Sequence, residues 1–341
     1  MKNSKYFVTK LTLKAYDLIS SFYSFWLWKR WRRDESEILS QISQPIKNVK
    51  VALQSQKILV VIPFRDKWEL TEQCLKSLVR EDLGPHRLEV VLVNNGSVEE
   101  KTKNGMSHWL EKSKDHIRFH ILDLEIPFNF SVINNRAVEF GRKFNPDLVL
   151  LLNNDIEFIE TSSIQSMVDG LHCSPDVDLL GCTLLYPDRS IQHLFVFPGS
   201  KIVGAHPYKG KHLSFQGPWF DSVQKVPAVT GAVMLMKMES YLDLGGFDES
   251  LPNCYQDVDL CIKVVASGGS VATNPKVKMI HHETQTRKPI PHWREVQYMY
   301  NKWHRILEEN PGIPRIFSRW SEQLNYAIIR KPYPWKKLKG P

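Results

Sequence analysis

"DLVLLLNNDIEF", residues 147–158, places an unbroken apolar run directly before a set of polar side chains. An apolar run without alternation indicates a strand that is buried on both faces, as in a parallel sheet covered by helices. Strand patterns alternate with helical patterns before it, strand first, at residues 57–63, 68–79, 88–95, 98–113, 117–124 and 131–144. The sequence therefore predicts βαβ units in a doubly wound, mostly parallel α/β sheet.

Polar residues follow three of these predicted strands. Arg65 and Asp66 follow the first strand, residues 94–97 (Asn, Asn, Gly, Ser) end the second, and residues 153–155 (Asn, Asn, Asp) end the last. In open α/β sheets, the ligand site lies outside the carboxyl ends of the strands. We therefore expect these polar groups to meet at one edge of the sheet.

The turn after the first strand, "IPFRDKWEL" (62–70), argues against two classes of nucleotide-binding protein. It contains no GxGxxG, the glycine pattern with which dinucleotide-binding domains open their first helix. The chain also contains no GxxxxGK[ST] phosphate loop. An NAD-dependent enzyme and a P-loop NTPase are therefore not expected.

Composition limits the classes of binding partner and the cellular compartment that are expected. The net charge of +8 over 341 residues indicates an anionic partner, such as nucleic acid, a phosphorylated small molecule or an acidic membrane face. No common nucleic-acid-binding motif occurs, so nucleic acid is not expected. Five cysteines, an odd number without CxxC spacing, favour a reducing compartment over a disulfide framework or a zinc ribbon.

The N-terminal region combines aromatic residues with basic ones. "LISSFYSFWLW" (18–28) is shorter than the ~20 residues needed to span a bilayer, and "KRWRR" (29–33) follows it directly. Two interpretations fit this pattern. The segment is either an interfacial helix on an anionic membrane surface, or a helix packed on the protein's own body or on a partner.

Beyond residue 155 the pattern changes from regular alternation to a mixture with a long loop-rich section. Helical patterns are predicted at 161–173, 256–269 and 295–309. Strands are predicted at 179–186 and 230–237, and another ends in "MIHHE" (279–283). This half is expected to complete the domain that the first half begins.

The motifs of the chain, taken in order, resemble those of a family 2 glycosyltransferase of GT-A fold, in particular bacterial enzymes that build O-antigen or related surface polysaccharides. The resemblance covers roughly residues 57–288, through "VVIPFRDK", "VNNGS", "PFNFSVINNRAV", "LLLNNDIEF", "LLYPDRSIQH", "VTGAVMLMK", "LGGFDES", "YQDVDLCIKV" and "HHETQTR". It implies a GT-A domain at 56–288, made of a nucleotide-binding half (56–155) and an acceptor half (156–288), between a helical, basic and aromatic extension (1–55) and a helical, basic one (289–341).

The resemblance assigns the strand-end residues to the nucleotide-sugar donor. In the family, the loop that corresponds to "VNNGS" holds the base and ribose, usually with an Asp where this chain has Asn94. The amide of Asn94 can still donate and accept hydrogen bonds. The donor site that the resemblance implies consists of Pro63, Arg65, Asp66, Asn94, Asn95, Asn135, Asn153, Asn154 and Gly231.

"NNDIEF" corresponds to the DxD metal motif of the family. Side chains alternate along extended chain, so Asn153 and Asp155 point the same way and can offer oxygens to one cation. An Asx turn is the alternative explanation of such residues at a strand end. The resemblance implies Asp155 as the carboxylate ligand, His281 as a second ligand with His282 as the alternative, and Mn²⁺ or Mg²⁺ as the cation.

"QDVDLC" would supply the general base. Carboxylates at a helix start are also explained by the helix dipole. The resemblance assigns to Asp257 the removal of the proton from the acceptor hydroxyl, and leaves a structural role to Asp259. Gln256 stands where the family usually has Glu or Asn. A single base fits direct, inverting displacement better than a covalent intermediate.

The resemblance thus implies a metal-dependent inverting glycosyltransferase, cytoplasmic or peripheral on the cytoplasmic face of the inner membrane. It would move a sugar from a UDP-, dTDP- or GDP-sugar to a glycan or lipid-linked glycan. A sugar nucleotidyltransferase is one alternative, but it would need a glycine-rich loop after the first strand. A non-catalytic binding module is another, because Asn94, Asn153 and Gln256 each replace a residue that is usually acidic in the family.

Overall fold

The chain divides into two units, residues 1–42 and 43–341, and all of the structure described below lies in the second. The predicted N-terminal segments 18–28 and 29–33 and the chain beyond 309 lie outside the described residues. The computed structural model describes residues 45–46, 54–113, 116–196, 198, 203–204, 206, 208–210, 212, 219–282 and 293–309.

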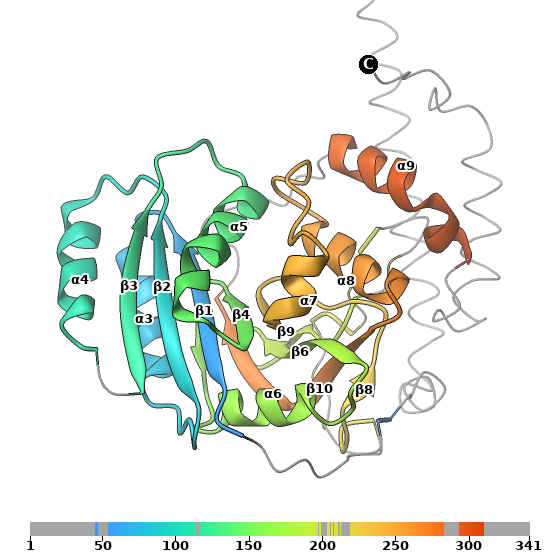
Figure 1. The fold of residues 1–341 in the computed structure, drawn as a ribbon, viewed down its shortest axis with the longest axis horizontal. Coiled ribbons are helices and arrows are strands. Elements are labelled where there is room, and N and C mark those ends of the chain that lie inside the picture. Colours follow the sequence, from blue (N-terminus) through green and yellow to red (C-terminus); the bar gives the residue numbers. More distant parts are fainter. Residues whose placement is uncertain are drawn as a thin grey trace, which may run out of the picture. The chain divides into compact units, whose positions relative to one another are not determined.

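Four parallel strands form the half of the sheet that the sequence predicts most directly (Figure 1). They lie in the order β3-β2-β1-β4, so that β1 pairs with both β2 and β4. Apart from Pro63, the interior residues of β1, β2 and β4 are buried, as their continuous apolar runs indicate. The bounds are β1 (Lys57–Phe64), β2 (Arg87–Asn94), β3 (Ile117–Asp123) and β4 (Leu148–Leu152).

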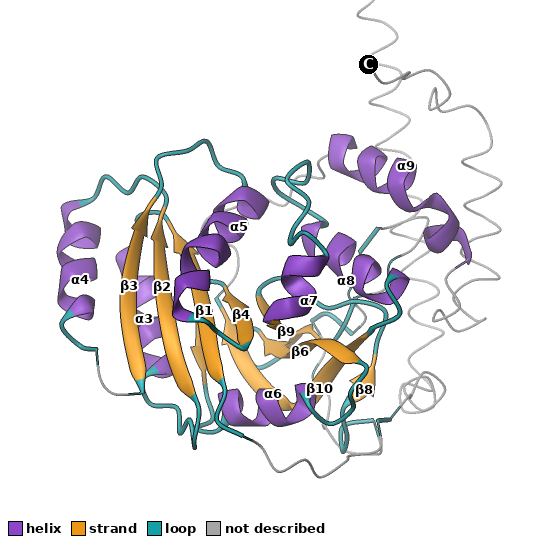
Figure 2. Ribbon diagram, viewed as in Figure 1, coloured by secondary structure: helices purple, strands orange, loops and turns teal. Residues whose placement is uncertain are grey.

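Helices cover both faces of these strands, which confirms the doubly wound arrangement. Ile58, Val60 and Ile62 of β1 belong to one core cluster with residues of α3 (Trp68–Leu78) and α4 (Glu100–Leu110). Leu59 points to the other face, where helix α5 (Phe130–Gly141) packs so closely that a Cβ on Gly141 would lie 2.4 Å from Leu59 Cδ2. Figure 2 shows α5 and α3 on opposite sides of the strands.

The second half of the sheet is mixed rather than parallel. Strand β9 (Val233–Lys237) is antiparallel to β4 and to β6 (Val177–Leu185), whereas β6 and β10 (Ser270–His281) are parallel. Apolar runs do not reveal strand direction, and the sequence therefore did not predict this change. Further elements complete this half: β5 (Ile156–Phe158), α6 (Ser163–Leu171), β7 (Ile191–His193), β8 (Gln224–Lys225), α7 (Met238–Asp243), α8 (Gln256–Ala266) and α9 (Trp293–Glu309).

Two general properties of the described residues concern the cysteines and the length of the helices. All five cysteines are free, and four of them are buried, which agrees with the absence of a disulfide framework. In the part of the chain that the structure describes, no helix combines the length and the apolar character needed to cross a bilayer.

Candidate active site

Asp66, which follows β1, forms hydrogen bonds with the loop that follows β2. Its Oδ1 atom accepts hydrogen bonds from the backbone N–H groups of Val98 (2.8 Å) and Glu99 (3.0 Å), and its own N–H donates to Ser97 Oγ (2.8 Å). Asp66 and Lys67 both have left-handed backbone conformations, with φ of 53° and 49°. The sequence indicated Asp66 as a donor ligand, but in the structure its carboxylate ties the two loops together.

Asn94 and Asn95 are nearly buried, with exposed fractions of 8% and 3%. Asn94 accepts from Ser97 N (2.9 Å) and donates to Asp123 Oδ1 (2.8 Å) at the end of β3. The Asn95 amide, oriented to donate, reaches the backbone oxygens of Leu124 (3.0 Å) and Ile126 (3.2 Å). These two asparagines therefore shape the loop at the edge of the sheet.

Arg65 and Pro63 lie at the same edge, as predicted. Pro63 is partly exposed, and the Arg65 side chain is exposed. Within the described residues, no group forms an ion pair with the Arg65 guanidinium. Arg65 is therefore available to an anionic ligand at the end of β1.

The polar residues after β4 meet the end of β10. His281 Nε2 lies 3.1 Å from Asp155 Oδ1, and the Asn153 amide lies 3.5 Å from the same imidazole nitrogen. The backbone also joins here, since His282 N donates to Asp155 O (2.9 Å). Residues far apart in the sequence thus form one cluster, and Asp155 and Asn153 are both partly exposed.

Gln192 fixes the orientation of the His281 ring. Its Oε1 atom, which can only accept, lies 2.5 Å from His281 Nδ1, and its Nε2 donates to the His281 backbone oxygen (3.3 Å). The proton of a neutral ring is therefore on Nδ1, and the Nε2 lone pair faces Asp155 Oδ1. This oxygen is buried, and it pairs with His281 only when Nε2 carries a proton. Two acceptors in this arrangement need a proton or a cation between them.

The electrostatics of Asp155 agree with such a site. Burial alone would raise the pKa of its carboxyl group, but the hydrogen bond and charge of His281 outweigh burial and hold the pKa below its usual range. Asp155 is therefore ionised at neutral pH. The described residues contain no group of three or more His, Cys, Asp or Glu side chains that could hold a metal, so Asp155 and His281 would need ligands from substrate or water.

A second pair of side chains lies beside this one. His282 Nε2 is 2.9 Å from Glu157 Oε2, and Gln73 of α3 donates to the same oxygen (2.9 Å). Asn154 donates to Thr71 Oγ1 (2.9 Å), also on α3. The side chain of His282 is thus engaged away from Asp155, which favours His281 over His282 as the partner of Asp155.

Asp257 lies in the first turn of α8. Its Oδ2 accepts from Gly231 N (2.9 Å), and its Oδ1 accepts from Val258 N (2.8 Å). The residue is partly exposed. Gly231 allows this close approach, because a Cβ there would lie 3.3 Å from Asp257 Cβ. Gly231 was predicted to bind the nucleotide-sugar. In the structure its backbone N–H holds the carboxylate of Asp257.

Burial raises the pKa of Asp257, and the hydrogen bonds from Gly231 and Val258 offset only part of this effect. A carboxylate with a raised pKa is a stronger base. Gln256 beside it is nearly buried, and its Oε1 receives no hydrogen bond from the described part of the chain. The amide found in place of a carboxylate thus adds no negative charge next to Asp257.

Residues 231 and 232 connect Asp257 to the cluster around Asp155. Gly231 N donates to Asp257, and the next residue, Ala232, accepts a hydrogen bond from Asn153 N (2.9 Å) through its backbone oxygen. The carboxylate of Asp257 and the backbone of Asn153, two residues before Asp155, thus reach the same short stretch of chain before β9. The structure brings together what the sequence placed in separate motifs.

Two histidines whose role the sequence did not indicate lie next to this stretch. Thr230 N donates to His193 Nε2 (3.3 Å), so the ring proton of His193 is on Nδ1, which lies 3.1 Å from His206 Nδ1. Burial lowers the pKa of His193 well below its ordinary value and that of His206 to about 4. Both rings are therefore neutral near pH 7. Spacing alone could not reveal this pair, because it depends on the fold of the loop-rich section.

Asn135 is not part of the cluster. Its Oδ1 accepts from Tyr241 OH (2.7 Å) and Phe247 N (3.0 Å), and its Nδ2 donates to Phe247 O (2.9 Å) and Glu249 Oε1 (3.1 Å). These contacts tie α5 to the segment after α7 and use the hydrogen-bonding capacity of the amide. In this structure Asn135 holds these segments together, and its contact with the donor stays a prediction.

Sequence comparison identifies similar proteins. Residues 59–189 match the family described as "Glycosyl transferase family 2". The O-antigen biosynthesis protein RfbC of Myxococcus xanthus is 30% identical over 242 residues, which is 68% of this chain and 18% of that protein. The uncharacterized protein y4gI of Sinorhizobium fredii is 33% identical over 72% of this chain and 27% of its own length. The chain thus spans less than a third of either of these two relatives.

A further relative and two solved structures carry more specific names. An N-acetylglucosaminyl-diphospho-decaprenol L-rhamnosyltransferase of Mycobacterium tuberculosis is 23% identical over 58% of this chain and 66% of that protein. The mannosyltransferase PcManGT from Pyrobaculum calidifontis, solved with GDP-Man and Mn²⁺, has a TM-score of 0.55 at 16% identity and covers 94% of this chain and 80% of its own. GalNAc-T7, solved with UDP, GalNAc and Mn²⁺, has a TM-score of 0.58 at 12% identity, with coverages of 82% and 53%. Residues 59–189 of this chain therefore match glycosyl transferase family 2, and the described part of the chain has the GT-A fold.

Proposed function

We propose that the chain transfers a sugar from a nucleotide-sugar donor to a glycan acceptor, with a divalent cation and with inversion at the anomeric carbon. The observation that carries this proposal is the pair of partly exposed carboxylates, Asp155 and Asp257, because residues 231 and 232 bond to Asp257 and to Asn153, two residues before Asp155. One carboxylate has a buried oxygen that faces an imidazole lone pair when the ring is neutral, and the other has a raised pKa. Binding of a cation and acceptance of a proton need these two properties.

Asp155 and His281 would hold the cation, with Asn153 close by. Mn²⁺ and Mg²⁺ accept carboxylate oxygens and leave positions for phosphate oxygens and water, and imidazole nitrogen suits Mn²⁺ better than Mg²⁺. When bound, the cation would supply positive charge to the diphosphate leaving group. Both similar solved structures were obtained with Mn²⁺.

Asp257 would accept the proton of the acceptor hydroxyl. Its carboxylate is held in one orientation by Gly231 N and Val258 N, which leaves lone pairs of both oxygens for an incoming hydroxyl. The second carboxylate of the motif, Asp259, is fully buried and bound to other residues. A single carboxylate at the reaction centre supports direct displacement over a two-step route through a covalent intermediate.

The donor nucleotide would lie at the ends of β1 and β2. Arg65 supplies an exposed positive charge there, and Asp123 offers an exposed carboxylate that Asn94 orients. For the acceptor, we propose a growing surface glycan, in line with the names of the O-antigen and rhamnosyltransferase relatives. A lipid-linked acceptor at the cytoplasmic face of a membrane is the form of this proposal that the basic N-terminal segment suggests.

A donor screen tests the function directly. The full chain would be melted with UDP-, dTDP- and GDP-sugars, with Mn²⁺ and with EDTA, since a ligand that binds only the folded state raises the melting temperature. Release of the nucleoside diphosphate from the stabilising donor would then be measured. We expect one nucleotide class to stabilise the protein in Mn²⁺ and to be slowly hydrolysed. Binding without any hydrolysis or transfer would instead support a non-catalytic module.

A further inference from the structure

Helix α9 presents one face to the catalytic half of the domain. Glu295, Tyr298, Met299 and Lys302 follow the spacing i, i+3, i+4, i+7, which places them on one side of a helix. Glu295 and Met299 are buried, with exposed fractions of 4% and 0%. Two of the remaining positions, Arg294 and Arg305, are exposed. The buried face of α9 is therefore mainly polar, which implies specific contacts rather than apolar packing alone.

The N-terminal part of this face holds the chain just before α8. The Glu295 carboxylate accepts hydrogen bonds from the backbone N–H groups of Asn253 (3.0 Å) and Cys254 (2.6 Å) and from the Asn253 side chain (3.0 Å). Charge-assisted bonds from backbone amides to a buried carboxylate are among the stronger hydrogen bonds in proteins. Glu295 thus fixes the segment that leads into the first turn of α8.

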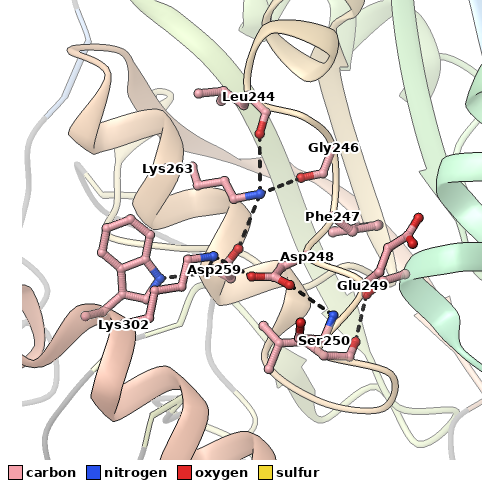
Figure 3. A network of polar contacts seen from close by, with 12 residues as sticks. Leu244, Gly246, Phe247, Asp248, Glu249, Ser250, Asp259, Lys263 and Lys302 are labelled. Atoms are coloured by element: carbon pink, nitrogen blue, oxygen red, sulfur yellow. Dashed lines mark hydrogen bonds and ion pairs between the residues drawn. The ribbon is translucent and has the colours of Figure 1, made fainter. Parts of the chain in front are cut away.

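The next two turns of α9 hold α8 itself (Figure 3). Lys302 Nζ lies 2.7 Å from Asp259 Oδ1 and 2.6 Å from Asp248 Oδ2, and Trp303 Nε1 donates to Asp259 Oδ1 (2.6 Å). The helix is kinked at Trp303, with φ of −123°. Asp259 is fully buried, and Lys263, 3.5 Å away, is the nearest cation on its own helix.

Loss of Lys302 would leave this buried carboxylate with a weaker set of partners. Removal of one member of a buried ion pair is strongly destabilising, because the other charge stays desolvated. Asp259 would then be stabilised either by taking up a proton or by moving toward water, together with the turn of α8 that carries it. The contacts with α9 therefore determine where the start of α8 lies.

Asp257 lies between the two points of attachment. Cys254, which Glu295 holds, is three residues before it, and Asp259, which Lys302 and Trp303 hold, is two residues after it. We propose that Glu295 and Lys302 are positioning residues, through which α9 keeps Asp257 against Gly231 for the transfer reaction. This inference rests on the proposed role of Asp257 as the base.

Hydrogen exchange tests the attachment without any need for activity. In the full chain, Lys302→Met should speed exchange of the amides of residues 253–259 by at least about tenfold, the effect of losing a charged hydrogen bond. Arg305→Met, which removes a positive charge from the exposed face of α9, should leave this exchange unchanged. Lys302→Arg should restore it in part. Where Lys302→Met prevents folding, Glu295→Gln, which keeps the shape of the side chain, serves in its place.

Kinetics then separate positioning from simple stability. Lys302→Met should lower kcat by about 100-fold, as expected for a misplaced catalytic group, with the donor KM within about twofold of wild type. The acid limb of the kcat profile should move to lower pH, because a loosened turn lets water reach Asp257 and burial no longer raises its pKa as much. The neighbouring Tyr255 and Cys261 stay neutral in this range, because burial raises their pKa values as well.

The outcomes are distinct. Unchanged exchange at 253–259 in both Lys302→Met and Glu295→Gln would overturn the inference. A lower kcat without faster exchange and without a shifted acid limb would overturn it too, since Lys302 would then act by another route. A wild-type protein that shows neither transfer nor donor hydrolysis would refute the proposed function, while the exchange experiment would still decide whether α9 holds this turn.

Discussion

His281 Nε2 lies 3.1 Å from Asp155 Oδ1, and Gln192 places the proton of the neutral imidazole on the opposite nitrogen. The end of β10 thus supplies a lone pair that faces an ionised carboxylate at the end of β4. His282, the next residue, pairs with Glu157 instead. The alternation of side chains along a strand explains why neighbouring histidines reach different partners.

This geometry separates the two histidines experimentally. His281→Ala should weaken nucleotide-dependent Mn²⁺ binding by at least about 10- to 100-fold, the loss typical of removing even an outer-shell partner, because it would remove the proposed imidazole ligand. His282→Ala should change it by less than about threefold, because His282 contacts Glu157 and Gln73. Calorimetric titration of Mn²⁺ into the protein with saturating nucleoside diphosphate measures both. Equal losses in the two variants would contradict the assignment of His281.

Variants of Asp66 distinguish a side chain that binds the nucleotide from one that only holds two loops together. Its Oδ1 accepts two backbone hydrogen bonds from residues 98 and 99. Asp66→Asn keeps an acceptor at this position and should retain nucleotide affinity, whereas Asp66→Ala should lower the free energy of unfolding by about 1 to 3 kcal/mol. Urea denaturation and nucleotide titration of both variants measure this. A large loss of affinity in Asp66→Asn, without loss of stability, would show instead that the carboxylate contacts the nucleotide.

Substitution of Gly231 should disturb Asp257, because the two residues lie in close contact. A methyl group there would lie 3.3 Å from Asp257 Cβ, closer than most such contacts allow. Gly231→Ala should therefore shift Asp257 and lower kcat by about tenfold or more, with a smaller effect on the donor KM. Steady-state kinetics with the donor found in the screen provide the measurement. Wild-type kcat in this variant would argue against a fixed position of Asp257 in the reaction.

Stability should depend on pH through Glu81, which lies outside the site. Its Oε2 accepts from Ile164 N (2.9 Å) at the start of α6, and burial raises the pKa to about 7 from the ordinary value of 4.5. The folded state therefore binds the proton more tightly than the unfolded state does. The contribution of protonated Glu81 to the free energy of unfolding is fully present below pH 4.5 and is lost as the pH rises through 7.

Glu81→Gln removes this dependence, because an amide does not titrate. Relative to the variant, the wild type should lose about 2 to 3 kcal/mol of unfolding free energy between pH 4.5 and 8. Urea denaturation across this range, with the exposed Glu160→Gln as the matched control, provides the comparison. Parallel pH profiles for the wild type and Glu81→Gln would show that Glu81 is not protonated in the folded state at neutral pH.

The sequence predicted the parallel half of the fold well, and its failures have physical causes. Continuous apolar runs and helical periods located β1 to β4 and their helices, because burial on both faces leaves a strong pattern. The antiparallel direction of β9 and the short strands β5, β7 and β8 leave no such pattern, since they depend on pairing with other strands, and α7, with six residues, is too short to show a helical period.

The site shows the same division. Asp155, His281 and Asp257 were predicted through motifs; the structure pairs Asp155 with His281, and residues 231 and 232 bond to Asp257 and to Asn153. The roles of Asp66 and Asn135 were not predictable from motifs alone, because both side chains bind to backbone groups of other segments. Spacing gives the residue type at a position, whereas the folded chain decides which partner satisfies its hydrogen bonds.

The central claim is that Asp155 binds the cation and that Asp257 accepts the proton of the acceptor hydroxyl. One paired measurement tests it. Nucleotide binding by calorimetry and sugar transfer by product formation would be recorded in Mn²⁺ for wild type, Asp155→Asn and Asp257→Asn. Asp257→Asn should bind nucleotide like the wild type and transfer no sugar, whereas Asp155→Asn should lose both activities. Wild-type transfer by Asp257→Asn, or unchanged metal-dependent nucleotide binding by Asp155→Asn, would contradict the account.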